Sequence, residues 1–177
     1  MTRPTEELLF VPDAPAVVLA RMDLLAEAGD GWVNLLPVVE VSEGDEAGEA
    51  ERQVPRLGFS AMFGGGPVPR VPMCTWMPPA RGRRPAGATV GIMHARGRRA
   101  VQQLGGLGVE LPGSWHVLQD HQRRGLVVRA APDAGHAEVL GWACRAGRAL
   151  CLAAPTGEWR AIVHLPSPGP QRVRVRE

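Results

Sequence analysis

The chain has 177 residues, of which 45% are hydrophobic and 21% charged, enough for one domain with a substantial core and too apolar for a disordered protein. Its N-terminal segment has acidic residues where a signal peptide would have basic ones, and no apolar run is long enough to span a membrane. These features exclude a membrane-spanning protein and predict a cytoplasmic one.

The net charge of +2 hides a division of charge along the chain. Residues 1–51 contain twelve acidic residues and two arginines, a net charge of −10, whereas residues 52–177 contain eighteen arginines and six acidic residues, a net charge of +12. This division predicts an anionic partner for the basic part, or pairing of the acidic part with the basic one.

The first expected element is a helix over residues 14–28. Asp13 can cap its free N–H groups, Pro15 suits its first turn, and Gly29 provides a stop. Residues 1–13 are expected to form a loose N-terminus.

Three strands are expected next, over residues 32–41, 57–63 and 71–77. Pro37 cannot donate a ladder hydrogen bond, which predicts an edge position or a bulge for the first of these strands. Residues 42–53 are acidic and nearly free of bulky apolar side chains, so we expect a mobile loop there. The first two strands are therefore predicted to pair as a hairpin around that loop, within a helix-plus-meander unit over residues 14–79.

The region from residue 87 to 165 has the element order β-α-β-β-α-β. Asp133 is expected to cap its second helix. This order is that of a ferredoxin-like unit, an antiparallel sheet with both helices on one face. The chain is thus predicted to be a single α+β domain, residues 1–177, with a disordered or edge-docked tail over residues 166–177. The six elements are strand 88–93, helix 95–107, strand 115–120, strand 125–130, helix 133–149 and strand 158–164.

Arginine is the outstanding candidate for binding, because all twenty basic residues are arginine. The pentapeptide Ala-Arg-Gly-Arg-Arg occurs at residues 80–84 and again at residues 95–99, the second time at the expected start of a helix. Planar guanidinium groups suit phosphate and carboxylate, and a helix N-terminus favours anions. The predicted anion-binding residues are Arg81, Arg83, Arg84, His94, Arg96, Arg98 and Arg99.

The predicted ligand is a phosphate-bearing small molecule or the backbone of a nucleic acid. The strands at residues 88–94 and 126–130 contain no aromatic residue, which argues against the base stacking of a common RNA-binding module. The alternative interpretation is that the arginines are solvated, or pair with the acidic segment 40–51.

The sequence gives little evidence for other kinds of functional site, and no metal, cofactor or catalytic residue is predicted. Cys74, Cys144 and Cys151 lack the CxxC spacing and are expected as reduced, partly buried thiols. His116, Asp120 and His121 are close in sequence but do not share one face of a strand. The expected role of the tryptophans is core packing. They are Trp32, Trp76, Trp115, Trp142 and Trp159.

The sequence favours a non-catalytic binding or regulatory protein that holds an anion through an arginine cluster. Two alternatives remain open. One is a structural or assembly protein that forms a homodimer through its acidic and basic halves. The other is a small enzyme that uses histidine or cysteine in a reaction that the sequence does not define.

Overall fold

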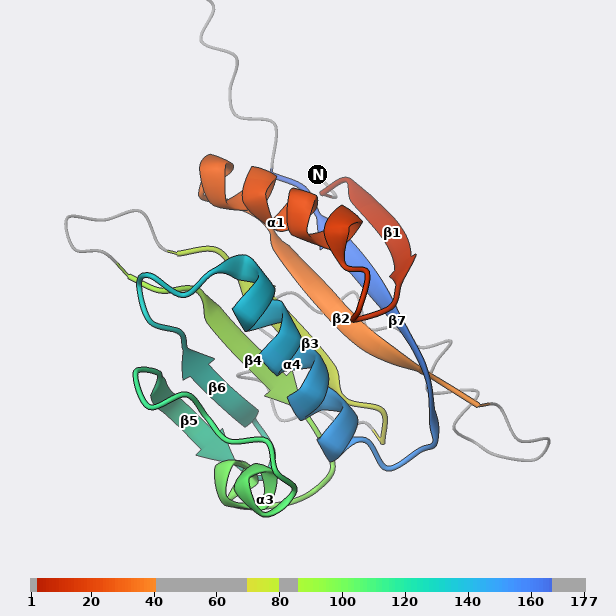
Figure 1. The fold of residues 1–177 in the computed structure, drawn as a ribbon, viewed down its shortest axis with the longest axis vertical. Helices are drawn as coiled ribbons and strands as arrows, with labels where there is room; N and C mark the ends of the chain where they lie inside the picture. The colour runs from red at the N-terminus through yellow and green to blue at the C-terminus, as the bar shows by residue number, and fades with distance from the viewer. Residues whose placement is uncertain (1–2, 41–69, 80–85, 167–177) are drawn as a thin grey trace, which may run out of the picture.

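The structure is a computed structural model and describes residues 3–40, 70–79 and 86–166. These residues form a mixed α+β fold with an open, entirely antiparallel seven-stranded sheet (Figure 1). The strands are β1 (Thr5–Phe10), β2 (Trp32–Val39), β3 (Met73–Met77), β4 (Thr89–Met93), β5 (His116–His121), β6 (Gly125–Arg129) and β7 (Pro155–His164). The helices are α1 (Ala16–Ala28), α3 (Ala100–Gly106) and α4 (His136–Leu150).

All three helices lie on the same face of the sheet (Figure 1). Most strand side chains that point to this face are apolar, and with the buried sides of the helices they form one large core. Glu6 of β1 and Asp120 of β5 are polar exceptions that bond to α1 and α3. The period-2 pattern accounts for this arrangement, because alternate residues of a strand point to the same face. Leu35 of β2, Trp76 of β3 and Ile92 of β4, each at most 1% exposed, are central to that core.

The sheet is larger than the ferredoxin-like unit that the element order suggests. Its strand order is β1-β7-β2-β3-β4-β6-β5, so β4, α3, β5 and β6 have the expected arrangement, with β6 between β4 and β5. In a ferredoxin-like unit β7 would lie directly beside β4. Here β2 and β3 lie between them, because β2 pairs with β7 and β3 pairs with β4. The ferredoxin-like unit predicted over residues 87–165 is therefore not confirmed, and the N-terminal strands are part of the same sheet.

The N-terminal segment is more ordered than predicted. Residues 1–13 were expected to be loose, but β1 pairs antiparallel with β7 along its whole length, from Thr5 to Phe10. Phe10 is buried in the core and Leu8 packs against it, so the strand has one apolar side to contribute. The prediction failed because two core-facing residues in a short, acidic stretch give a weak periodic signal.

Pro37 lies in β2, an interior strand of the sheet, and the β-bulge predicted for it is confirmed. The register of β2 against β7 shifts between Pro37 and Val39, as at a β-bulge. The edge position is wrong, since Val33, Asn34 and Leu35 pair with β3 on one side and β7 on the other. The acidic loop 42–53 and the strand 57–63 lie outside the described residues.

The helix ends differ in how well the sequence predicts them. Gly29 ends α1 in the left-handed conformation, as expected, with φ of 61°. The predicted caps are wrong, because neither Asp13 nor Asp133 bonds to a helix N-terminus. Pro15 and Gly135 hold the cap positions, and neither helix has a side-chain cap hydrogen bond.

Helix α4 packs closely on the centre of the sheet at Gly147. A Cβ atom there would lie 2.8 Å from Sγ of Cys74 and 2.8 Å from Trp159, closer than van der Waals contact allows. Trp159, like Trp76 and Trp142 elsewhere in the core, is at most 2% exposed, as predicted for core tryptophans. The missing side chain is what lets α4 approach β3 and β7.

This contact yields a paired test of packing. Gly147→Ala should lower the free energy of unfolding by about 1–3 kcal/mol, because an added methyl group overpacks the core. Gly141→Ala, on the same helix, meets only the flexible end of Arg145 at 3.4 Å and should raise it by up to about 1 kcal/mol through helix propensity. Urea denaturation of both variants would measure the two effects, and equal effects would contradict this account of the packing.

Candidate functional site

The sheet topology brings two separate loops together at one end of the sheet. Strands β4 and β6 are antiparallel neighbours, with Ile92 opposite Leu126. The segment that leaves β4 and the hairpin that enters β6 must therefore meet at the same end. These are residues 94–99, which contain the second arginine pentapeptide, and residues 121–125, which form the β5–β6 turn.

Gly125 makes this close approach possible. Its φ is 75°, and a Cβ atom there would lie 2.2 Å from the backbone oxygen of Ile92. A side chain at this position would have to push the hairpin away from β4, and glycine also adopts the positive φ at little cost. The hairpin is therefore held against the end of β4 by backbone contact.

The segment before α3 is a loop, and the helix begins later than predicted. Gly97 and Arg99 both have positive φ values, of 84° and 60°, which interrupt a right-handed helix at these residues. The prediction of a helix over residues 95–107 is correct only for Ala100–Gly106.

Asp120 occupies the start of α3. Its two carboxylate oxygens accept hydrogen bonds from the backbone N–H groups of Ala100 and Val101, at 3.0 and 3.1 Å. Two N–H groups of the first turn of α3 are thus satisfied by a carboxylate of the protein itself. They are not free for the anion that is expected at the helix N-terminus.

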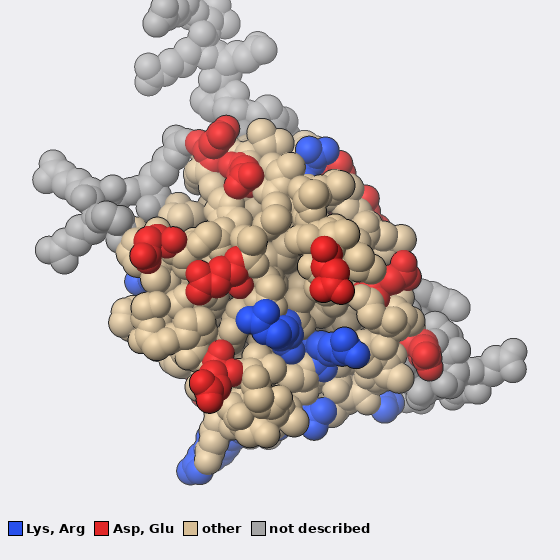
Figure 2. All heavy atoms as spheres, in the orientation of Figure 1, with Lys and Arg blue, Asp and Glu red and all other residues tan. Residues whose placement is uncertain are grey.

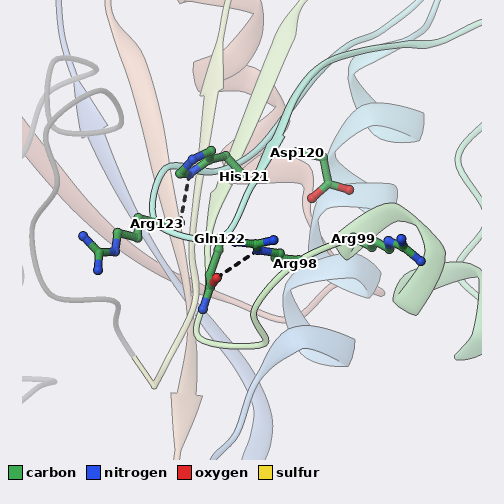
Figure 3. Close-up of a pocket in the computed structure, with 6 residues that line it drawn as sticks. All are labelled: Arg98, Arg99, Asp120, His121, Gln122 and Arg123. Carbon is green, nitrogen blue, oxygen red and sulfur yellow. Dashed lines mark hydrogen bonds between the residues drawn. The ribbon is translucent and has the colours of Figure 1, made fainter.

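These segments enclose an open hollow of about 700 Å³ (Figure 3). Figure 3 shows Arg98 next to Gln122 at the centre, with the guanidinium groups of Arg99 and Arg123 on opposite sides. The hollow thus combines three cations with one carboxylate that is already hydrogen-bonded. It is lined by Arg98, Arg99, Asp120, His121, Gln122 and Arg123.

The hydrogen bonds leave mainly donors free to face a ligand. Nε of Arg98 donates to Oε1 of Gln122 at 3.3 Å, which leaves the terminal N–H groups of Arg98. The backbone N–H of Arg123 donates to Nδ1 of His121 at 3.1 Å, so the imidazole carries its proton on Nε2 and can donate from there. The guanidinium groups of Arg99 and Arg123 show no hydrogen bond or ion pair within the part of the chain that the structure describes.

The structure brings only some of the predicted site residues together in the hollow. Arg98 and Arg99 lie in the hollow. Arg96 does not line it and instead donates to the backbone oxygen of Cys151 at 3.2 Å. His94 is only 1% exposed and does not line it either, so it has no direct access to a ligand. The other arginine pentapeptide lies outside the described residues, namely Arg81, Arg83 and Arg84.

The site also contains residues that the prediction did not assign to it. Asp120, His121 and Arg123 are not among the predicted anion-binding residues. Gln122 carries no sequence signal of its own. A usable signal was the hairpin turn before β6, since a hairpin that pairs with β4 must meet the loop that leaves β4.

A second polar cluster lies on the face of the sheet that carries no described helix. The hydroxyl of Thr75 donates to Oδ1 of Asn34 at 2.9 Å, and Nδ2 of Asn34 lies 3.2 Å from Nε2 of His164. The ring of His164 stacks on Trp32 with centroids 4.4 Å apart, and Arg3 lies over the same indole at 5.1 Å. Asn34, Thr75 and His164 are thus hydrogen-bonded to one another, whereas the indole N–H of Trp32 has no hydrogen-bond partner among the described residues.

Charge is separated on the helical face of the molecule (Figure 2). Most acidic side chains lie over the upper part of the view, which contains α1, and most basic side chains gather toward α3 and the C-terminal end of α4, although each part also shows a group of the other sign. Part of the acidic charge is internally paired, because Glu6 accepts two hydrogen bonds from Arg21 at 2.7 and 2.8 Å. The division of charge along the sequence is therefore partly preserved in space.

The described residues include neither a reactive thiol nor a metal site. Cys74, Cys144 and Cys151 are buried free thiols, and burial raises the pKa of Cys144 to about 12, which keeps the thiol protonated and unreactive. Within the described ranges, no three His, Cys, Asp or Glu side chains are arranged to hold a metal ion. None of the described helices has both the length and the apolar character needed to cross a bilayer.

Comparison with protein families, with characterised proteins and with solved structures finds no match for this chain. The geometry of the hollow is therefore the basis on which a function can be proposed.

The capping role of Asp120 can be tested by substitution. Asp120→Ala should lower the free energy of unfolding by about 1–2 kcal/mol, because two N–H groups of α3 lose their acceptor. Asp120→Asn retains one acceptor oxygen and should cost less. Thermal or urea denaturation would measure both, and an unchanged stability of the alanine variant would show that the carboxylate does not hold α3.

Two buried imidazoles predict how stability depends on pH. Burial lowers the pKa of His94 below its ordinary value of 6.5, although the Asp120 carboxylate opposes this shift, and burial together with Arg3 lowers the pKa of His164. Below about pH 6.5 the unfolded chain therefore binds more protons than the folded one. The free energy of unfolding should fall as the pH falls from about 6.5 toward the lowered values.

His94→Phe should weaken this pH dependence, because it removes one of the two imidazoles with a lowered pKa. The substitution should cost little else, since neither ring nitrogen of His94 has a hydrogen-bond partner among the described residues. Urea denaturation at pH 7.5 and at pH 5.5, about one unit either side of the ordinary histidine value, would measure the change. An identical pH dependence in wild type and variant would show that His94 is not one of the responsible groups.

Proposed function

We propose that this protein is a non-catalytic binding or regulatory module that holds an anionic ligand in the hollow between residues 94–99 and the β5–β6 turn. The observation that carries the proposal is the hydrogen-bond inventory of the hollow. Its free polar groups are N–H donors on Arg98, Arg99 and Arg123 and on His121, whereas the carboxylate of Asp120 is engaged by α3.

Donors of this kind favour a ligand made of oxygen acceptors with negative charge. A guanidinium group presents paired N–H groups that match two oxygens of a phosphate or carboxylate, and such charge-assisted bonds are among the stronger hydrogen bonds in proteins. A neutral ligand would leave these cations without compensation once water is displaced. A phosphate-bearing ligand therefore suits the hollow best.

Calorimetric titration with inorganic pyrophosphate at low ionic strength tests the proposal. The wild-type protein should bind, and the double variant Arg99→Glu/Arg123→Glu should bind about 100-fold more weakly or not at all, because two attractive contacts become repulsive. Circular dichroism of the same variant would establish that it is folded.

A matched control separates this site from the general charge of the protein. Arg145→Glu/Arg148→Glu makes the same change in net charge at two exposed positions on α4 that do not line the hollow. This control should bind pyrophosphate nearly as the wild type does. Equal weakening by both double variants would reduce the effect to net charge and overturn the proposed site, as would absence of binding by the wild type.

A further inference from the structure

The three arginines of the hollow do not converge on one point. Arg98 lies at the centre, held to Gln122, and the guanidinium groups of Arg99 and Arg123 lie on either side of it and point away from each other (Figure 3). A compact anion at any one place can contact only part of this set. An anion that engages all three must be extended and must carry charge at intervals.

The backbone around each arginine is fixed by local contacts, so this spread is built into the fold. The side-chain amide of Gln103 donates to the backbone oxygens of Arg96 and Arg98, which holds the loop before α3. The side-chain amide of Gln119 donates to the backbone oxygen of Arg124 at 2.9 Å, which holds the hairpin turn. Arg124 is itself exposed beside Arg123 and extends the basic surface along the turn.

The hollow has no large aromatic ring on which a base could stack. None of its six lining residues is a tryptophan, phenylalanine or tyrosine on which a base could stack. Of the described tryptophans, Trp76, Trp115, Trp142 and Trp159 are buried, and Trp32 lies on the other face of the sheet. Contacts would therefore be to phosphates, which fix position without selecting sequence.

The shape of the site favours single-stranded nucleic acid over a duplex. The donors line a concave surface formed by two loops, and a flexible strand can follow it from Arg99 past Arg98 to Arg123. Duplex DNA is stiff, with a persistence length of about 50 nm, and would touch mainly the groups at the rim. We infer that the hollow binds the phosphate backbone of single-stranded nucleic acid without base readout, an inference that rests on the proposed anion-binding function.

Salt dependence provides the sharpest test, because each phosphate contact releases counterions. Three contacts to a single strand predict that log Kd rises with log salt with a slope of about 2, or about 15-fold weaker binding at 200 mM than at 50 mM salt. The probe is a fluorescently labelled oligothymidylate of about twelve nucleotides, a length that one small domain can cover, measured by anisotropy. Arg99→Ala and Arg123→Ala should each reduce the slope by about 0.7.

The controls define what would overturn the inference. Arg145→Ala should leave the slope unchanged, an oligoadenylate should bind about as well as the oligothymidylate, and a duplex of equal length should bind more weakly. No binding of the oligonucleotide, an unchanged slope in both alanine variants, or equal binding of the duplex would each overturn it. If pyrophosphate still binds in those cases, the proposed function survives and only the nucleic-acid ligand is rejected.

Discussion

The candidate site depends on the antiparallel pairing of β4 with β6. This pairing places the end of one strand beside the start of the other, so a loop and a hairpin separated by more than twenty residues in sequence form the two sides of one hollow. Gly125 sets their distance, since any side chain there would collide with the backbone of Ile92. The positions of the arginines thus follow from main-chain geometry, and their separation follows from the turns that carry them.

The sequence predicts most elements of this fold and only part of its topology. Periodicity and glycine stops identify α1, α4 and the strands β2 to β7, and all of these except the edge strand β5 bury apolar side chains. It does not show that β2 and β3 lie between β7 and β4, since strand order is decided by packing between distant segments such as α4 on β3 and β7 at Gly147. Element order alone therefore suggests a smaller unit than the sheet that forms.

The sequence identifies only some of the residues that line the candidate site. The arginine pentapeptide predicts a place for anions, and two of its members, Arg98 and Arg99, lie in the hollow. Asp120 of β5 bonds to the N-terminus of α3, and His94 is buried. The sequence does not predict either feature, because both depend on tertiary contacts between distant segments. The hairpin residues that complete the hollow require knowledge that β6 pairs with β4.

The position of β7 has a consequence for how the chain acquires this fold. The two earliest strands, β1 and β2, do not pair with each other, because β7 lies between them. During synthesis from the N-terminus, that part of the sheet must wait until more than one hundred further residues have left the ribosome. Strand pairing over such a sequence separation is slow, and the waiting strands expose unpaired edges. The facing edges of β1 and β2 therefore stay open to wrong pairing partners until β7 is inserted between them.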